Sequence, residues 1–106
     1  MDDAAIAAYQ ADPVWPLRVA AAHTIPRELR AEGRAGEAGL EALANVRQRV
    51  LQILGGESKP EFAEATAALD DHLADGRVVV IPGARHAAHH THPDALIEAI
   101  DTFLPA

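Results

Sequence analysis

The stretch VVVIPG at residues 78–83 decides the fold of this chain. Its run of β-branched residues favours a strand, and the Pro-Gly pair that follows turns the chain out of it. A second apolar run, VLQIL at residues 50–54, is closed by Gly55 and Gly56 and indicates another buried strand. The segment between the two runs has apolar residues at helical spacing, namely Phe62, Ala65, Leu69 and Leu73. A strand, a helix and a strand in this order predict two parallel neighbouring strands with a right-handed crossover.

Two helix starts are expected around these strands. Ser58 with Glu61 three positions later is the pattern of a capping box, so it predicts the start of the crossover helix. Thr91 and Asp94 repeat that spacing before a last helix, whose apolar stripe comprises Leu96, Ile97, Ile100, Phe103 and Leu104. Residues 50–106 therefore predict a β-α-β-α arrangement.

The two strands are expected to need further neighbours. Neither apolar run alternates with polar residues, which indicates burial on both faces of the sheet. Two strands leave two unpaired edges, and an exposed apolar edge is a liability in a soluble protein. We therefore expect at least one outer edge to lie against further strands, as at the end of a larger sheet.

Residues 1–49 are predicted to be helical throughout. Short helices are expected over residues 4–11, from Pro16 onward, after Thr24, and from Leu40 to Val46. None carries a strong apolar stripe, so we expect these helices to need another surface on which to pack. The fold class predicted for the whole chain is α/β, with a helical N-terminal half (1–49) followed by the β-α-β-α part (50–106).

Composition excludes several functions. The 106 residues suit one domain or a piece of a larger one, and 9 basic against 16 acidic residues give a net charge of −7. Such a chain repels phosphate backbones, so we expect no nucleic-acid partner, and it has no apolar run of membrane-spanning length. With no cysteine, disulfides and thiolate chemistry are excluded. We expect a cytoplasmic protein, and the eight arginines to one lysine, with 24 alanines, suggest a GC-rich bacterial genome.

His86 and Glu57 are the candidate catalytic residues. His86 follows the strand at 78–81, and Glu57 follows the strand at 50–54. Sites in open α/β sheets gather at the carboxyl ends of the strands, and neighbouring strands lie roughly 4.8 Å apart, so the two side chains could meet. A carboxylate there would hold the tautomer of the imidazole and stabilise its protonated form, as a general base requires. The alternative is a histidine in a turn and a solvated acid at a helix start.

The same residues resemble a known family. Residues 78–86 and 91–96, with the closing apolar helix, resemble the C-terminal end of the α/β-hydrolase superfamily, which implies that His86 is the catalytic base. Residues 51–58 resemble the penultimate strand and acid-bearing turn, which implies Glu57 as the triad acid, although many members would place it at the position of Ser58. Residues 1–49 are similar to the helical cap of some members. The resemblance implies a hydrolase for small ester, amide or epoxide substrates that works without a cofactor.

This sequence departs from the family at the nucleophile. The family carries it on a G-x-S-x-G elbow before the acid, whereas the one serine here, Ser58, is flanked by Glu57 and Lys59. The oxyanion-hole loop has no counterpart in these residues either. We therefore expect negligible hydrolase activity from this chain alone, which would be a truncated reading frame, an excised half, or a degenerate relative that pairs with itself or with another chain.

Two other function classes remain open. The cluster His86, His89, His90 and His92 could bind Zn, Ni or Cu through neutral imidazoles, or could be a set of solvated loop histidines. The unpaired strand edge would instead suit a non-catalytic interaction module, whose partner would be another copy of the chain or the missing N-terminal half of a hydrolase.

Overall fold

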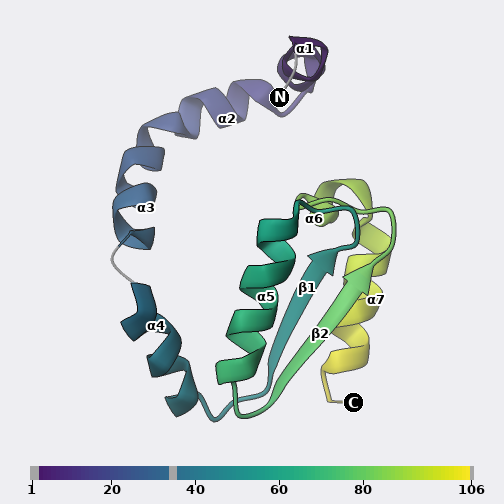
Figure 1. The fold of residues 1–106 in the computed structure, drawn as a ribbon. Coiled ribbons are helices and arrows are strands. Elements are labelled where there is room, and N and C mark those ends of the chain that lie inside the picture. Colours follow the sequence, from purple (N-terminus) through teal and green to yellow (C-terminus); the bar gives the residue numbers. More distant parts are fainter. Residues whose placement is uncertain (1–2, 34–35, 106) are drawn as a thin grey trace. The chain divides into compact units, whose positions relative to one another are not determined.

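The computed structural model describes residues 3–33 and 36–105 of the chain. They form two compact units, Met1–Gly36 and Glu37–Ala106. The first unit contains α1 (Asp3–Ala11), α2 (Trp15–Ala21), the 3-10 turn η1 (Ala22–Thr24) and α3 (Ile25–Glu32). The second unit follows with the elements α4 (Gly36–Ala42), η2 (Leu43–Asn45), β1 (Val50–Gly55), α5 (Pro60–His72), β2 (Gly76–Ile81), α6 (Ala88–Thr91) and α7 (Pro93–Phe103) (Figure 1). The mixed α/β class predicted from the sequence is confirmed.

The described residues of the first unit, 3–33, are mainly helical, in line with the helical part predicted for residues 1–49, and have little core. Tyr9 packs against Trp15 edge to face, with ring centroids 5.4 Å apart, and the Arg18 guanidinium lies over the Tyr9 ring at 4.7 Å. No residue of α2 or α3 is buried. Leu17 and Leu29 are 69% and 61% exposed, so these helices present apolar surface that their own unit does not cover.

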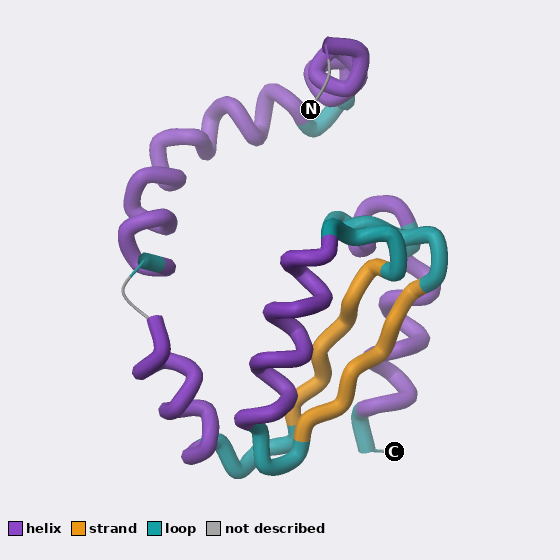
Figure 2. Tube along the Cα trace, viewed as in Figure 1, coloured by secondary structure: helices purple, strands orange, loops and turns teal. Residues whose placement is uncertain are grey.

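The sheet of the second unit is parallel, as the sequence predicts. The register pairs Val50 with Gly76 and Gly55 with Ile81, and within the described residues the sheet has no strand besides β1 and β2 (Figure 2). β2 begins at Gly76, two residues before the predicted β-branched run. Gly76 lets the strand start close to the end of α5, since a Cβ there would meet the Asp70 carboxylate, which would have to move aside.

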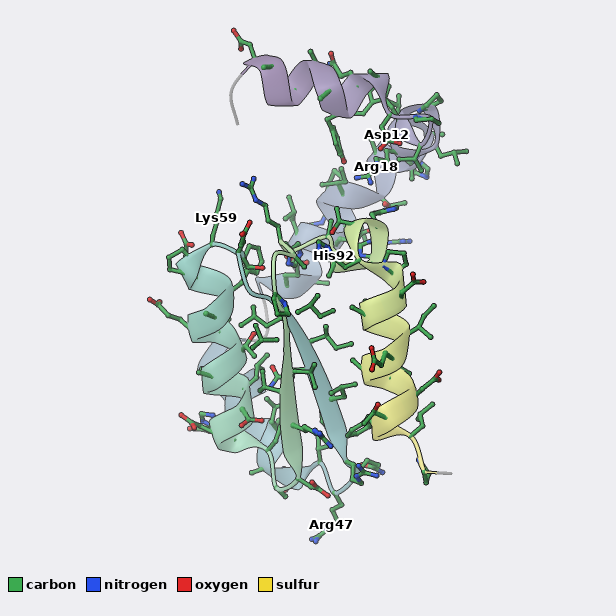
Figure 3. All side chains as sticks on the ribbon, turned by 90° about the vertical axis from the view of Figure 1, so that its right-hand side faces the viewer. Asp12, Arg18, Arg47, Lys59 and His92 are labelled. Atoms are coloured by element: carbon green, nitrogen blue, oxygen red, sulfur yellow. The ribbon has the colours of Figure 1, made fainter. Side chains whose placement is uncertain are left out.

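Helices cover both faces of this sheet. α5 lies on one face and α7 on the other (Figure 3). Gln52 points to the α5 face, where its side-chain amide donates to the Thr66 carbonyl at 3.2 Å. Ile53, the next residue, points to the other face and packs against the buried cluster of Ile81, Ala84 and Ala88, as Leu96 of α7 does. A helix over each face fits the lack of alternation between apolar and polar residues in the strands, although Val80 of β2 remains 51% exposed.

The core is small. Among the described residues, the buried apolar side chains are Ile81, Ala84, Ala88 and Ala99. Three of these four are alanines, which bury little area each. The alanine-rich composition therefore leads to a core that is thin in large side chains.

Both predicted capping patterns are wrong. α5 begins at Pro60 with Lys59 at its N-cap, and α7 begins at Pro93 with His92 at its N-cap; neither start has a side-chain cap hydrogen bond. A proline in the first turn lacks an amide hydrogen and already has a helical φ angle, so these starts depend less on a side-chain cap. Lys59 and His92 lie at the same end of the sheet (Figure 3).

No helix in the described ranges combines the length and the apolar character needed to cross a lipid bilayer. The short helix α6 lies within the histidine-rich segment that the sequence predicts to be a loop.

Candidate functional site at the carboxyl edge of the sheet

The loops that follow the two strands are joined through their backbones. The Gly56 amide donates to the Ile81 carbonyl at 2.9 Å, and the Glu57 amide donates to the Ala84 carbonyl at 2.8 Å. Gly55 allows this approach, since a Cβ there would lie 2.5 Å from the Ala84 carbonyl oxygen. The turn after β1 and the loop after β2 therefore form one packed unit.

Ala84 anchors the loop that carries His86. Its side chain is 0% exposed and belongs to the core cluster with Ile81 and Ala88. Because residues 81, 84 and 88 are all held in the core, the backbone of residues 85–87 is pinned on both sides. His86 is thus an exposed side chain on a fixed loop at the end of a parallel strand, where α/β sheets place their sites.

The His86 ring stacks on Phe62. The two ring centroids are 4.1 Å apart with an interplanar angle of 19°, and Phe62 lies in the first turn of α5. This contact uses the face of the imidazole and fixes the plane of the ring. The two ring nitrogens lie in that plane, so the stack does not cover them. Phe62 was expected only as part of an apolar helix face, and no spacing rule in the sequence links it to His86.

Glu57 lies on the neighbouring turn, and its side chain is exposed. Its backbone joins the two loops, but in the described structure no hydrogen bond links its carboxylate to the His86 ring. The structure therefore brings together the loops of the two predicted site residues and leaves their side chains unconnected. Catalytic hydrogen bonds often tighten only when substrate binds.

Ser58 lies beside Glu57 with an unusual environment for a hydroxyl. Its Oγ is buried and has no hydrogen-bond partner, while its amide donates to the Gly55 carbonyl at 3.0 Å. Ser58 thus forms part of the turn after β1, at the position where the resemblance would place the triad acid. It is not on a strand-to-helix elbow, because Lys59, with an extended backbone, separates it from the first residue of α5, Pro60.

The other three histidines of the cluster contact their neighbours in the chain and do not converge on one point with His86. His89 and His90 are adjacent on α6, with ring centroids 4.2 Å apart and planes tilted by 44°. His92 forms a hydrogen bond between its Nδ1 and the Thr91 hydroxyl at 2.8 Å. Across the residues that the structure describes, no group of three or more His, Asp or Glu side chains could hold a metal ion.

Two grooves lie elsewhere on the second unit. One, of about 260 Å³, lies between β2 and α7 and includes Arg77, Val79 and Glu98. The other, of about 190 Å³, lies between η2, β1 and α5 and includes Leu43, Val46 and Leu69. Neither groove is lined by His86 or Glu57, and both of these residues are exposed.

Comparisons of this chain with protein-family models, with curated protein sequences and with solved structures find no match.

Proposed function

We propose that this chain is a hydrolase-like module in which His86 is the general base for a nucleophile carried by another polypeptide segment. The observation that carries the proposal is the pinned loop after β2, which presents an exposed imidazole beside the turn after a parallel neighbouring strand. A base at this place can take a proton from an attacking hydroxyl or water, as ester and amide hydrolysis require.

The roles of the other residues follow from their positions. Phe62 is a positioning residue, because its stack on His86 fixes the plane of the imidazole. Glu57 is the proposed acid, because its amide donates to the Ala84 carbonyl in the loop that carries His86 and its side chain is exposed. The nucleophile and the oxyanion donors come from the complementing segment, because the sequence has one serine and its Oγ is buried.

The first test is the activity of the chain alone. We expect no turnover of p-nitrophenyl esters above the rate of free imidazole, because a base without nucleophile and oxyanion donors loses most of the rate enhancement of a triad. Measurable turnover by this chain that disappears in His86→Ala would contradict the incomplete-site model.

The second test looks for the complementing segment. The DNA on both sides of the coding region is sequenced, and any product with a G-x-S-x-G motif is expressed together with this chain. We expect ester turnover from the mixture, lost in His86→Ala and retained in the matched variant His89→Ala on α6. Turnover that survives His86→Ala, or a mixture that is inactive although the two chains bind, refutes the role of His86.

A further inference from the structure

A polar side chain interrupts the apolar surface between β1 and α5. Gln52 is the one polar side chain of β1, and it lines the groove beside α5 together with Leu69 and Leu73. An amide in such surroundings loses water on folding, so it destabilises the fold unless it forms a hydrogen bond. Gln52 forms one, since its Nε2 donates to the Thr66 carbonyl of α5 at 3.2 Å.

Thr66 links this turn of α5 to the turn before it. Its hydroxyl donates to the Phe62 carbonyl, four residues earlier, at 2.7 Å. A threonine that bonds back in this way bends its helix, so it helps to set the direction of the preceding turn. At the start of the helix the Phe62 amide donates to the Lys59 carbonyl at 3.0 Å. The backbone of Phe62 is therefore bonded on both sides.

The two rings of the His86–Phe62 stack are both held from β1. The His86 loop is held by the hydrogen bond from the Glu57 amide, in the turn after β1, to the Ala84 carbonyl. Phe62 is held through Thr66 and the side chain of β1 that bonds it. The attraction between stacked rings depends on their offset, so a shift of α5 along the sheet changes how the two rings meet.

These contacts form one continuous path. It runs from Gln52 to Thr66 and from Thr66 to Phe62 by hydrogen bonds, and from Phe62 to His86 by the ring stack. The first three residues are half-buried, and His86 is exposed. An apolar side chain at position 52 would fill the groove equally well, but apolar packing has no direction. A hydrogen bond has one, so it selects a single position of α5 along the strand.

We propose that Gln52 and Thr66 are positioning residues for His86, because together they hold Phe62 where its ring fixes the plane of the imidazole. The inference rests on the proposed function, in which the orientation of His86 decides how well it takes a proton from the nucleophile. Neither residue touches the reacting atoms. Their effect reaches the site only through Phe62.

The experiment follows the ring protons of His86 by NMR in the full chain, at about pH 8.5, where histidine side chains are ordinarily neutral. His86→Ala assigns these signals, and Phe62→Leu gives their position without the stack. We expect Gln52→Leu and Thr66→Val to shift them downfield by at least about a third of the change that Phe62→Leu produces. Thr66→Ser keeps the hydroxyl and should keep the signals of the natural chain.

Two matched controls repeat these substitutions away from the path. Thr102→Val lies on α7, over the other face of the sheet, and Gln48→Leu changes an exposed residue before β1. Both should leave the His86 signals in place. The substitutions in the path leave the helical backbone bonds of α5 unchanged, and circular dichroism checks that each variant folds. Gln52→Met is a second variant that removes the donor and keeps the length of the side chain.

Signals that stay in place in Gln52→Leu or in Thr66→Val overturn the proposal. So do signals that Thr102→Val shifts as much as Thr66→Val, or that Thr66→Ser fails to keep. These measurements need no substrate. Unmoved signals would therefore leave the role of His86 as a base to the activity tests, and a failure of those tests would leave this path of contacts in place.

Discussion

Replacing Gly55 by alanine tests the packed loop pair on which the candidate site depends. Gly55 ends β1, and an added Cβ would lie 2.5 Å from the Ala84 carbonyl oxygen and 2.7 Å from the Arg85 carbonyl carbon. Both are backbone atoms, so no flexible side chain can move aside. The Arg85 carbonyl oxygen would lie closer still, so the loop after β2 would have to recede by about 0.6 Å to reach the 3.0 Å limit of real Cβ contacts.

The loss of unfolding free energy on Gly55→Ala can be worked out from the contacts that the movement of the loop after β2 disturbs. Inserting a methyl group into a packed region costs about 1–3 kcal/mol. Moving the Ala84 carbonyl also weakens its 2.8 Å hydrogen bond from the Glu57 amide, which is worth about 0.5–1.5 kcal/mol. The lower entropy of alanine in the unfolded chain returns about 0.4–1 kcal/mol. We expect Gly55→Ala to lower the free energy of unfolding by about 2–3 kcal/mol.

The measurement is urea unfolding followed by circular dichroism, with Gly56→Ala as the matched control. At Gly56 a Cβ would lie 3.3 Å from the Ile81 carbonyl oxygen and 3.4 Å from a Val80 methyl, contacts that a small shift relieves. Gly56→Ala should therefore change the free energy of unfolding by less than about 1 kcal/mol. Equal effects of the two substitutions would show that the turn after β1 does not pack against the loop after β2, and the candidate site would lose its basis.

Three further substitutions probe the same end of the sheet. Ser58→Ala should raise the free energy of unfolding by about 1 kcal/mol, because it removes a buried hydroxyl without a partner; destabilisation in the same urea assay would mean that the hydroxyl is hydrogen-bonded. Gly83→Ala should lower that free energy by about 1–2 kcal/mol, because Gly83 has φ +75° and a Cβ is strained there; a neutral result would mean that the turn relaxes. Phe62→Leu should shift the NMR signals of the His86 ring protons downfield, because the phenyl ring that shields them is lost; signals that stay in place would show that the two rings do not stack in solution.

Most secondary structure was predictable because it depends on local pattern. The β-branched run at 78–81 and the apolar run at 50–54 predicted the two strands correctly. The order strand-helix-strand predicted their parallel pairing, since a crossover helix returns the chain to the same end of the sheet. The prolines at 60 and 93 were better markers of helix starts than the Ser58 and Thr91 capping patterns, which the structure contradicts. Side-chain capping needs a hydroxyl in the right rotamer, and spacing alone does not establish that.

For the candidate site, the sequence predicted which loops lie together but not which side chains make contact. Parallel strands end at one edge, so the neighbourhood of Glu57 and His86 followed from topology. The stack of His86 on Phe62 did not, because it joins residues 24 positions apart through the angle at which α5 crosses the sheet. The buried, unpartnered Ser58 hydroxyl likewise depends on how closely the two loops pack.

By itself, the sequence determined most of the helices, the two strands, their parallel direction and the absence of thiol chemistry, because each of these follows from residue type and order along the chain. The tertiary structure alone decided which side chain orients His86 and how closely the loops after the two strands pack. These are properties of surfaces that residues from β1, α5 and the loop after β2 build together. Such surfaces depend on packing angles and close backbone approaches, which are set only when distant segments meet.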